Sequence, residues 1–275
     1  MSAEVWMGYL LDHQPAFTVV QSPFVHEGER VFGADSDATT LAVASILHRL
    51  QHDNVTHVSV PEGINAATVA VATGVSLHDD DEHPATWDLL LSDEATVVLA
   101  RHDADVELAA MDVEIEVDSE FKQAMDMAWE QELQHHHVSQ GAYVSQAQYE
   151  EAARPRLLLE GQHGEQGAVW PPRYSPHSNE SVPAPRRLAR VGRVQTWTTL
   201  SAAGAPSEFA LRAPVLGGIS TVLLHLEDGP NGVFLVVDDE EFTPEMDGRM
   251  ELVLRRIYAQ EGFIRYGLKA RPIHQ

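Results

Sequence analysis

The sequence predicts an α/β part followed by an all-β part, and three observations support this fold class. The chain has 275 residues, which exceeds the usual size of a single domain. Apolar residues alternate between strand-like and helix-like spacing up to about Gln140, but are nearly all strand-like from Val191 to Ile273. A proline-rich segment separates the two patterns. We therefore expect an α/β domain over 1–140, a connector over 141–190 and a barrel over 191–275.

The first part contains alternating helix and strand signals. Leu41, Ala44 and His48 recur at helical spacing within Asp35–Leu50, and Asp35 or Ser36 can cap this helix. Small residues in Ile64–Thr73 permit close helix packing before Gly74. The other expected elements are strands over His57–Val60, Ala95–Ala100 and Val113–Val117 and a helix over Ser119–His135.

The second part reads as a loop-rich connector, Gln162–Arg190, followed by a small closed barrel. Prolines and glycines interrupt the connector, and Gly-containing turns such as Asn231-Gly232 separate the later apolar runs. Met250, Leu252 and Leu254 are alternate residues and form an apolar face on the last-but-one expected strand, as a barrel wall requires. Strands are expected over Val191–Leu200, Glu208–Val215, Ile219–Leu226, Gly232–Val237, Arg249–Tyr258 and Gly262–Ala270.

The net charge of -24 disfavours nucleic acid as a partner, because phosphate contacts need clustered basic residues. Lys122 and Lys269 are the only lysines, and such a composition is typical of salt-adapted, haloarchaeal proteins. No apolar run approaches the roughly 20 residues that span a bilayer, so no membrane association is expected. The acidic N-terminal stretch does not resemble a signal peptide, which predicts a cytoplasmic protein. There is no cysteine, which excludes disulfides and thiolate nucleophiles in this sequence.

The segment from about Arg154 to Ile273 resembles an OB-fold family that was long catalogued as a domain of unknown function and accompanies acyl-CoA enzymes. In that family a rubredoxin-like zinc ribbon with two cysteine pairs precedes the barrel. The same frame occurs here as HGEQG at His163–Gly167, WPPRY at Trp170–Tyr174 and SPHS at Ser175–Ser178. The resemblance thus implies a degenerate, metal-free ribbon with no zinc, whose former ligand positions are His163, Gln166, Ser175 and Ser178.

The first part resembles a truncated thiolase-fold enzyme, most closely the hydroxymethylglutaryl-CoA synthases. The resemblance is carried by VWMGYL near the start, DATTLAVA at Asp37–Ala44 and the stretch Ser92–Phe121. The chain between the last two pieces is too short for the segment that carries the nucleophilic cysteine in that family. The resemblance therefore implies a thiolase-like remnant without the covalent chemistry, and whether the chain is an enzyme at all stays open, with the missing nucleophile against it.

Coenzyme A or an acyl-CoA is the candidate ligand that these resemblances imply. Arginines suit its phosphates, and aromatic side chains on barrel strands can either stack on its adenine or pack in the core, core packing being the commoner use. The candidate coenzyme A contacts are Arg173, Arg255, Arg256, Phe263, Arg265 and Tyr266.

The resemblances imply a non-catalytic accessory or scaffold subunit of an acyl-CoA-handling complex. It would dock on a separately encoded thiolase or hydroxymethylglutaryl-CoA synthase-like enzyme and help to bind or channel its acyl-CoA; a homodimer is a further option. Two alternatives stay open: an acyl-CoA-acting enzyme with an unrecognised acid–base site, and an OB-fold binder of single-stranded nucleic acid.

Overall fold

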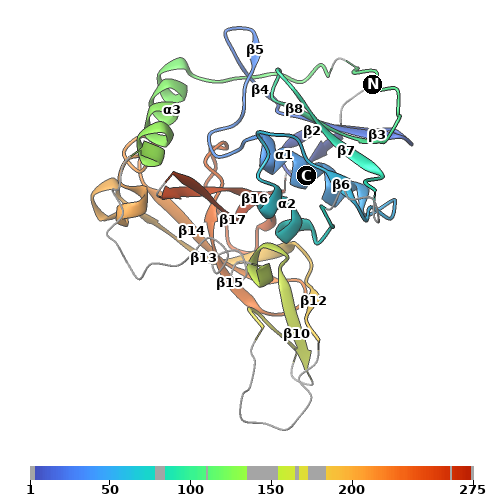
Figure 1. The fold of residues 1–275 in the computed structure, drawn as a ribbon. Coiled ribbons are helices and arrows are strands. Elements are labelled where there is room, and N and C mark those ends of the chain that lie inside the picture. Colours follow the sequence, from blue (N-terminus) through green and yellow to red (C-terminus); the bar gives the residue numbers. More distant parts are fainter. Residues whose placement is uncertain are drawn as a thin grey trace. The chain divides into compact units, whose positions relative to one another are not determined.

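The computed structural model describes residues 4–77, 84–109, 111–134, 154–164, 167–172, 184–260 and 262–273. The chain divides into two compact units (Figure 1). The first comprises Met1–Glu130 together with Leu254–Ile257, and the second comprises Gln131–Val253 and Tyr258–Gln275. The predicted domain boundaries at residues 140 and 190 stay a prediction.

The first unit is built on a six-stranded sheet with the order β1-β2-β3-β8-β7-β6. Neighbouring strands are antiparallel, except that β6 and β7 are parallel. Met7 and Gly8, both with positive φ, form the tight turn between β1 and β2. The strands are β1 (Glu4–Trp6), β2 (Tyr9–His13), β3 (Phe17–Gln21), β6 (Val58–Ser59), β7 (Trp87–Ser92) and β8 (Thr96–Arg101).

Both faces of the sheet are covered at β8, which explains the uninterrupted apolar run of this strand. Val98 and Ala100 belong to a buried cluster with Met111 on one face. The alternating side chains point to the other face, where Val97 and Leu99 are fully buried. Helix α1 (Ala38–Arg49) packs against β3 and β8, and α2 (Ala66–Thr73) packs against α1.

Helix α1 begins later than the sequence predicts. Its N-cap is Asp37, whose carboxylate accepts a hydrogen bond of 3.1 Å from the Thr40 backbone N–H. The Thr40 hydroxyl oxygen in turn accepts a hydrogen bond of 3.0 Å from the Asp37 backbone N–H, which completes a capping box. The expectation that Asp35 or Ser36 caps this helix is wrong, because both side chains are buried before the helix begins. Helix α2 ends at Gly74, whose φ of 74° favours glycine.

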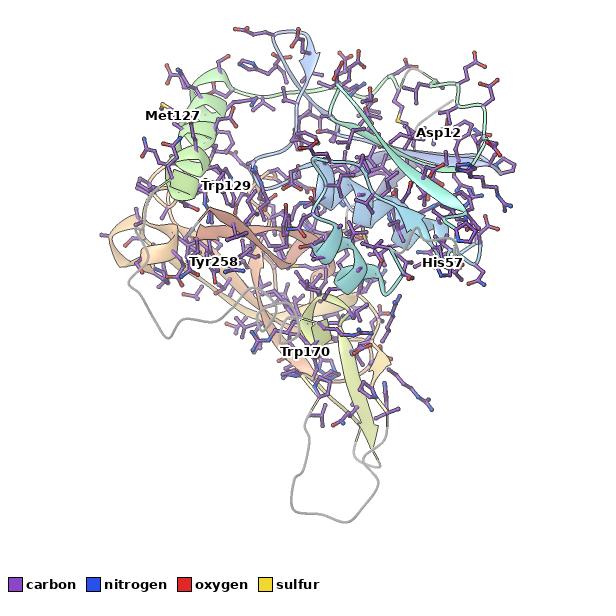
Figure 2. The ribbon with its side chains drawn as sticks, viewed as in Figure 1. Asp12, His57, Met127, Trp129, Trp170 and Tyr258 are labelled. Carbon is purple, nitrogen blue, oxygen red and sulfur yellow. The ribbon has the colours of Figure 1, made fainter. Side chains whose placement is uncertain are left out.

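A three-stranded sheet and a third helix complete the first half of the chain. The sheet has the order β5-β4-β9. Helix α3 begins at Ser119 as predicted, and the Asp118 carboxylate accepts from the Phe121 N–H at its start. The buried Trp129 indole donates to the Ala34 carbonyl at 2.8 Å, which anchors this part of α3 in the first unit (Figure 2). The elements are β4 (Phe24–His26), β5 (Glu29–Arg30), β9 (Ile115–Glu116) and α3 (Ser119–Gln134).

The second unit contains a closed barrel with the strand order β13-β14-β15-β17-β16, which is consistent with an OB-like fold. Strands β15 and β17 pair in parallel, whereas β14 pairs antiparallel with both β13 and β15. The predicted barrel of strands is confirmed, with two strands at the predicted bounds. The strands are β13 (Val191–Leu200), β14 (Ile219–Leu226), β15 (Asn231–Val236), β16 (Arg249–Gln260) and β17 (Phe263–Pro272).

The strand predicted over Glu208–Val215 is wrong. Two short 3₁₀ helices, η1 (Ala202–Gly204) and η2 (Ser207–Phe209), lie in this loop, and turns follow them. The Ala213 N–H donates to the Phe209 carbonyl at 2.8 Å, which is a helical spacing. Pro206 and Pro214 have no N–H to give to a sheet, so this alternating apolar pattern cannot join the barrel.

The connector contains a three-stranded sheet with the order β11-β10-β12, where the sequence predicts loops. Trp170, from the WPPRY motif, packs against the barrel (Figure 2). Its ring stacks on Phe234 of β15 at a centroid distance of 5.4 Å, and a Cβ at Gly232 would lie 3.1 Å from it. The strands are β10 (Glu160–Gly164), β11 (Gly167–Val169) and β12 (Arg186–Arg187).

Candidate functional site

His163, the first of the predicted former zinc positions, lies in the hairpin of β10 and β11. His163 is opposite Ala168, and Gly164 is opposite Gly167. The other three positions, Gln166, Ser175 and Ser178, lie outside the described residues. Within the part of the chain that the structure describes, no group of three or more His, Asp or Glu side chains could hold a metal. The interpretation of this segment as a ribbon that has lost its metal stays a prediction.

Two of the predicted coenzyme A contacts, Arg255 and Arg256, lie in the part of β16 that groups with the first unit. Arg255 is 1% exposed, and its Nε is 3.3 Å from the carboxylate of the fully buried Asp35. It also donates to the Met7 carbonyl at 3.0 Å and lies over the Tyr9 ring. Loss of either partner of such a buried ion pair would leave an uncompensated buried charge, which is strongly destabilising.

Arg256, like Arg255, contacts a backbone carbonyl and an aromatic ring within the first unit. Its guanidinium donates to the Ala34 carbonyl at 3.2 Å and lies 4.3 Å from the centre of the Trp129 ring. Its backbone N–H donates to the Asp35 carbonyl at 2.8 Å. Both arginines therefore hold the chain around Asp35, and a phosphate would compete with these contacts.

The other described candidates lie on β17, and Arg173 lies outside the described residues. Phe263 is 51% exposed, whereas Arg265 and Tyr266 are buried. The Arg265 guanidinium lies 5.9 Å from the centre of the Phe263 ring. The structure therefore brings Phe263 and Arg265 together, and Phe263 is the one of these three side chains that offers an open aromatic surface.

Buried charges in the second unit form a network that the sequence does not reveal. Arg212, 1% exposed, donates from Nε to the Glu132 carboxylate at 2.8 Å and lies 3.4 Å from the Asp238 carboxylate. Lys269 completes the network at 2.8 Å from Asp238. Burial raises the pKa of Glu132, and Arg212 partly offsets that rise. Each buried charge in the network is paired with an opposite one, so these groups are occupied with one another and not directed at a ligand.

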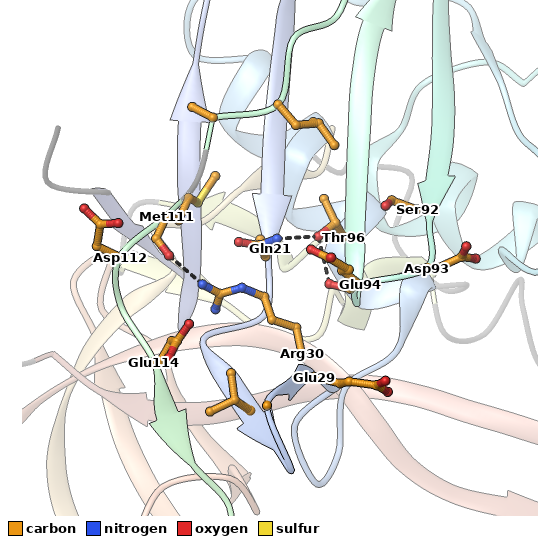
Figure 3. A pocket seen from close by; sticks show the side chains of 14 residues that line it. Gln21, Glu29, Arg30, Ser92, Asp93, Glu94, Thr96, Met111, Asp112 and Glu114 are labelled. Carbon is orange, nitrogen blue, oxygen red and sulfur yellow. Dashed lines mark hydrogen bonds between the residues drawn. The ribbon is translucent and has the colours of Figure 1, made fainter.

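A pocket of about 630 Å³ opens in the first unit between the β4–β5 hairpin, the β7–β8 turn and the segments 108–109 and 111–114 (Figure 3). The Arg30 guanidinium is held there by the carbonyls of Ser22, Met111 and Val113 at 3.1, 2.5 and 3.0 Å. The acidic side chains that line the pocket outnumber this cation, which disfavours the phosphates of coenzyme A. They are Glu29, Asp93, Glu94, Asp112 and Glu114.

Three histidines that sequence reasoning missed lie together at the end of α1. The ring centroids of His13, His48 and His52 are 4.8 to 5.0 Å apart. His48 is 5% exposed, and its Nδ1 has no hydrogen-bond partner. Burial, followed by the charges of His13, His52 and Arg49, lowers the pKa of His48 to about 4. The spacing of four residues between His48 and His52 was the available sequence signal; the third ring comes from strand β2.

The outer surface of the barrel carries large apolar side chains. Val233 on β15 is 66% exposed, and Trp197 and Leu200 on β13 are 39% and 41% exposed. Together with Phe263 these residues form what we call the apolar barrel residues. In a strongly acidic chain, exposed apolar side chains of this size are suited to contact with another protein.

No family model matches this sequence, and no match was found among curated proteins. A solved structure described as "Ltp2-ChsH2(DUF35) aldolase" is similar to part of the chain. The match covers 48% of this chain and 98% of that chain, with 18% sequence identity and a TM-score of 0.31.

Proposed function

We propose that this chain is a non-catalytic accessory subunit of an acyl-CoA-handling complex. Its OB-like barrel would dock on a cysteine-bearing thiolase or hydroxymethylglutaryl-CoA synthase-like enzyme. The observation that carries the proposal is the exposure of the apolar barrel residues, above all Val233 and Phe263. Burying such side chains against a partner is favourable by roughly 25 cal/mol per Å² of apolar surface.

The buried cations of the barrel support a structural role. Arg212 and Lys269 are bound to carboxylates, and Arg271 pairs with Glu240 and with Glu251, the latter at 2.8 Å. Groups engaged in this way hold loops to the barrel wall and have little freedom to assist a reaction. A scaffold requires this kind of rigidity, because a docking face must keep its shape.

The exposed Phe263 ring is the place where this chain would touch the acyl-CoA of its partner. An adenine can stack on such a ring, whose other neighbour is the guanidinium of Arg265 at 5.9 Å from the ring centre. This contact would help to hold the ligand while the chemistry takes place on the enzyme. On its acidic composition, we place the complex in the cytoplasm of a salt-adapted archaeal cell.

Co-purification at high salt with a separately encoded, cysteine-bearing thiolase-fold enzyme tests the proposal. The unaltered chain should co-elute with the enzyme, and Phe263→Glu and Val233→Glu should each weaken binding, because a charge would be buried at the interface. Leu90→Glu is a matched control, since Leu90 is an exposed leucine of the first unit.

Three results would contradict the proposal. The chain and the enzyme would elute separately, Leu90→Glu alone would abolish binding, or the purified chain would turn over short acyl-CoAs without a partner. The last result would favour the alternative of an enzyme with its own acid–base site.

A further inference from the structure

The arginines of this chain are unevenly distributed along the sequence. The segment 154–193 carries seven arginines, three glutamates and no aspartate. It therefore has an excess of four positive charges, in a chain whose net charge is -24. Six of these arginines belong to the part of the chain that the structure describes: Arg154, Arg156, Arg186, Arg187, Arg190 and Arg193.

Most cations outside this segment are paired with a carboxylate of the chain itself. At least eight of the eleven lysines and arginines there lie within 4.0 Å of an Asp or Glu oxygen. Within 154–193 the situation is different. No carboxylate of the described residues lies within that distance of Arg154, Arg156, Arg186 or Arg190. The cations that the chain does not neutralise are therefore concentrated in one short segment.

The fold of the second unit brings these arginines together. Arg186 of β12 pairs with Gly161 of β10, as the neighbouring strands in Figure 1 show. Further along the same two stretches of chain, the Arg190 guanidinium donates to the Leu157 carbonyl at 2.8 Å. The two stretches that carry the arginines therefore lie side by side. We call the following residues the arginine cluster: Arg154, Arg156, Arg186, Arg187 and Arg190.

The arginine cluster combines accessible cations with one that is shielded from water. Four of its members are exposed, and Arg190 is partly buried. Nη1 of Arg190 has no hydrogen-bond partner among the described residues. Burial, followed by the charge of Arg187, lowers the pKa of Arg190 to about 10, so its side chain is still a cation at pH 7. A cation that lacks solvent and lies near another cation is stabilised by an added anion.

We propose that the arginine cluster binds an acidic polypeptide segment of a partner protein. A guanidinium can donate two parallel hydrogen bonds to one carboxylate, so exposed arginines suit Asp and Glu side chains of another chain. The negative charge of this chain lies outside 154–193 and repels an acidic partner there. Charge complementarity thus directs such a partner to the cluster and sets the orientation in which it docks.

Nucleic acid is the other polyanion that arginines can bind, and the composition of the cluster disfavours it. Proteins that bind single strands add aromatic side chains on which the bases stack. The stretches 154–161 and 184–190 contain no aromatic residue. A net charge of -24 also opposes a long chain of phosphates. Carboxylates need the guanidinium groups alone, which favours an acidic polypeptide as the ligand.

Fluorescence anisotropy of a labelled decaglutamate peptide, titrated with the full chain, tests the proposal. In about 0.5 M KCl the screening length is a few ångströms, so the net charge of the chain acts over a short range while contact pairs remain. The peptide should bind under these conditions. Its dissociation constant should rise at least about threefold in about 2 M KCl, because salt screens ion pairs between exposed groups.

Two double variants with the same change in net charge provide the sharpest test. Arg154→Glu with Arg186→Glu reverses one exposed cation on each stretch and should raise the dissociation constant at least about tenfold. Arg101→Glu with Lys122→Glu is the matched control, because both side chains belong to the first unit and it should bind the peptide like the unaltered chain. Circular dichroism checks that each variant is folded, and the milder Arg154→Gln with Arg186→Gln should show a smaller loss of affinity.

The proposal would be overturned if the unaltered chain did not bind the peptide, or if the two charge-reversed variants bound it equally well. Tighter binding of a labelled ten-nucleotide oligothymidylate than of the peptide would also overturn it, in favour of nucleic acid as the ligand. The cluster contains none of the apolar barrel residues, and the experiment uses no acyl-CoA enzyme. Each of these results therefore leaves the proposed accessory role unaffected, and the two proposals fail separately.

Discussion

Individual side chains show how far burial can depart from residue type. Arginine usually lies on the protein surface, yet Arg212 is buried between Glu132 and Asp238. Asp35 was expected to cap a helix, but its carboxylate faces Arg255 at 3.3 Å instead. Glu132 lies 80 positions from Arg212, and Asp35 is still farther from Arg255 in the chain, so the local sequence does not indicate either pairing. A buried charge is tolerated only with its partner present.

His48 leads to a prediction about acid stability. Its pKa of about 4 lies below the ordinary value of 6.5, so the folded state binds fewer protons than the unfolded chain between these values. The stability that comes from the neutral ring is therefore complete above pH 6.5 and is lost as the pH falls towards 4. The urea midpoint, followed by tryptophan fluorescence, should fall between pH 7 and pH 5, and it should fall less in His48→Phe.

The control for this experiment is His225→Phe, which removes an exposed histidine of the barrel. That variant should show the same loss of stability between pH 7 and pH 5 as the unaltered chain. If His48→Phe also showed the full loss, carboxylates and not His48 would account for the acid sensitivity.

At the scale of single elements, the bounds of some strands follow directly from apolar periodicity and flanking turn residues. The bounds of β13 and β14 agree with the sequence prediction, because strand-like periodicity is bounded there by turn residues. Strands β1 to β3 and β7 were not predicted, and β8 was, although all of them lie in one sheet. Strand β1 is largely exposed, and buried residues do not alternate regularly with exposed ones in β2, β3 and β7, so the period-two signal of a strand is weak there.

The capping box of α1 gives a prediction for one element. Asp37→Ala removes the acceptor of the Thr40 N–H, which should lower the free energy of unfolding by about 1 kcal/mol. Asp37→Asn keeps a side-chain oxygen at the cap and should cost much less. Guanidinium chloride unfolding measures both variants. Equal losses in the two would show that the negative charge, and not the cap acceptor, is what Asp37 contributes.

The chain as a whole is dominated by its charge. A net charge of -24 on 275 residues favours the expanded state in dilute buffer through self-repulsion. The melting temperature should therefore rise when KCl is increased from about 0.1 to about 2 M, as measured by circular dichroism. Sucrose of equal osmolality is the control, because it strengthens burial without screening charge. A melting temperature that does not respond to KCl would contradict the interpretation of this chain as salt-adapted.

Periodicity, turn residues and the absence of cysteine sufficed to predict an α/β part, a barrel and the lack of thiolate chemistry. These properties depend on residues that are near one another in the chain, where hydrogen bonding and side-chain alternation act locally. Folding alone decided that Arg255 is buried against Asp35, that His13 joins His48, and that, among the described strands, β16 pairs with β13 only from Val191 to Arg193. The reason is that burial and strand pairing are set by distant partners: β13 has the periodicity of a barrel strand along its whole length, and only the position of β16 shows where its pairing stops.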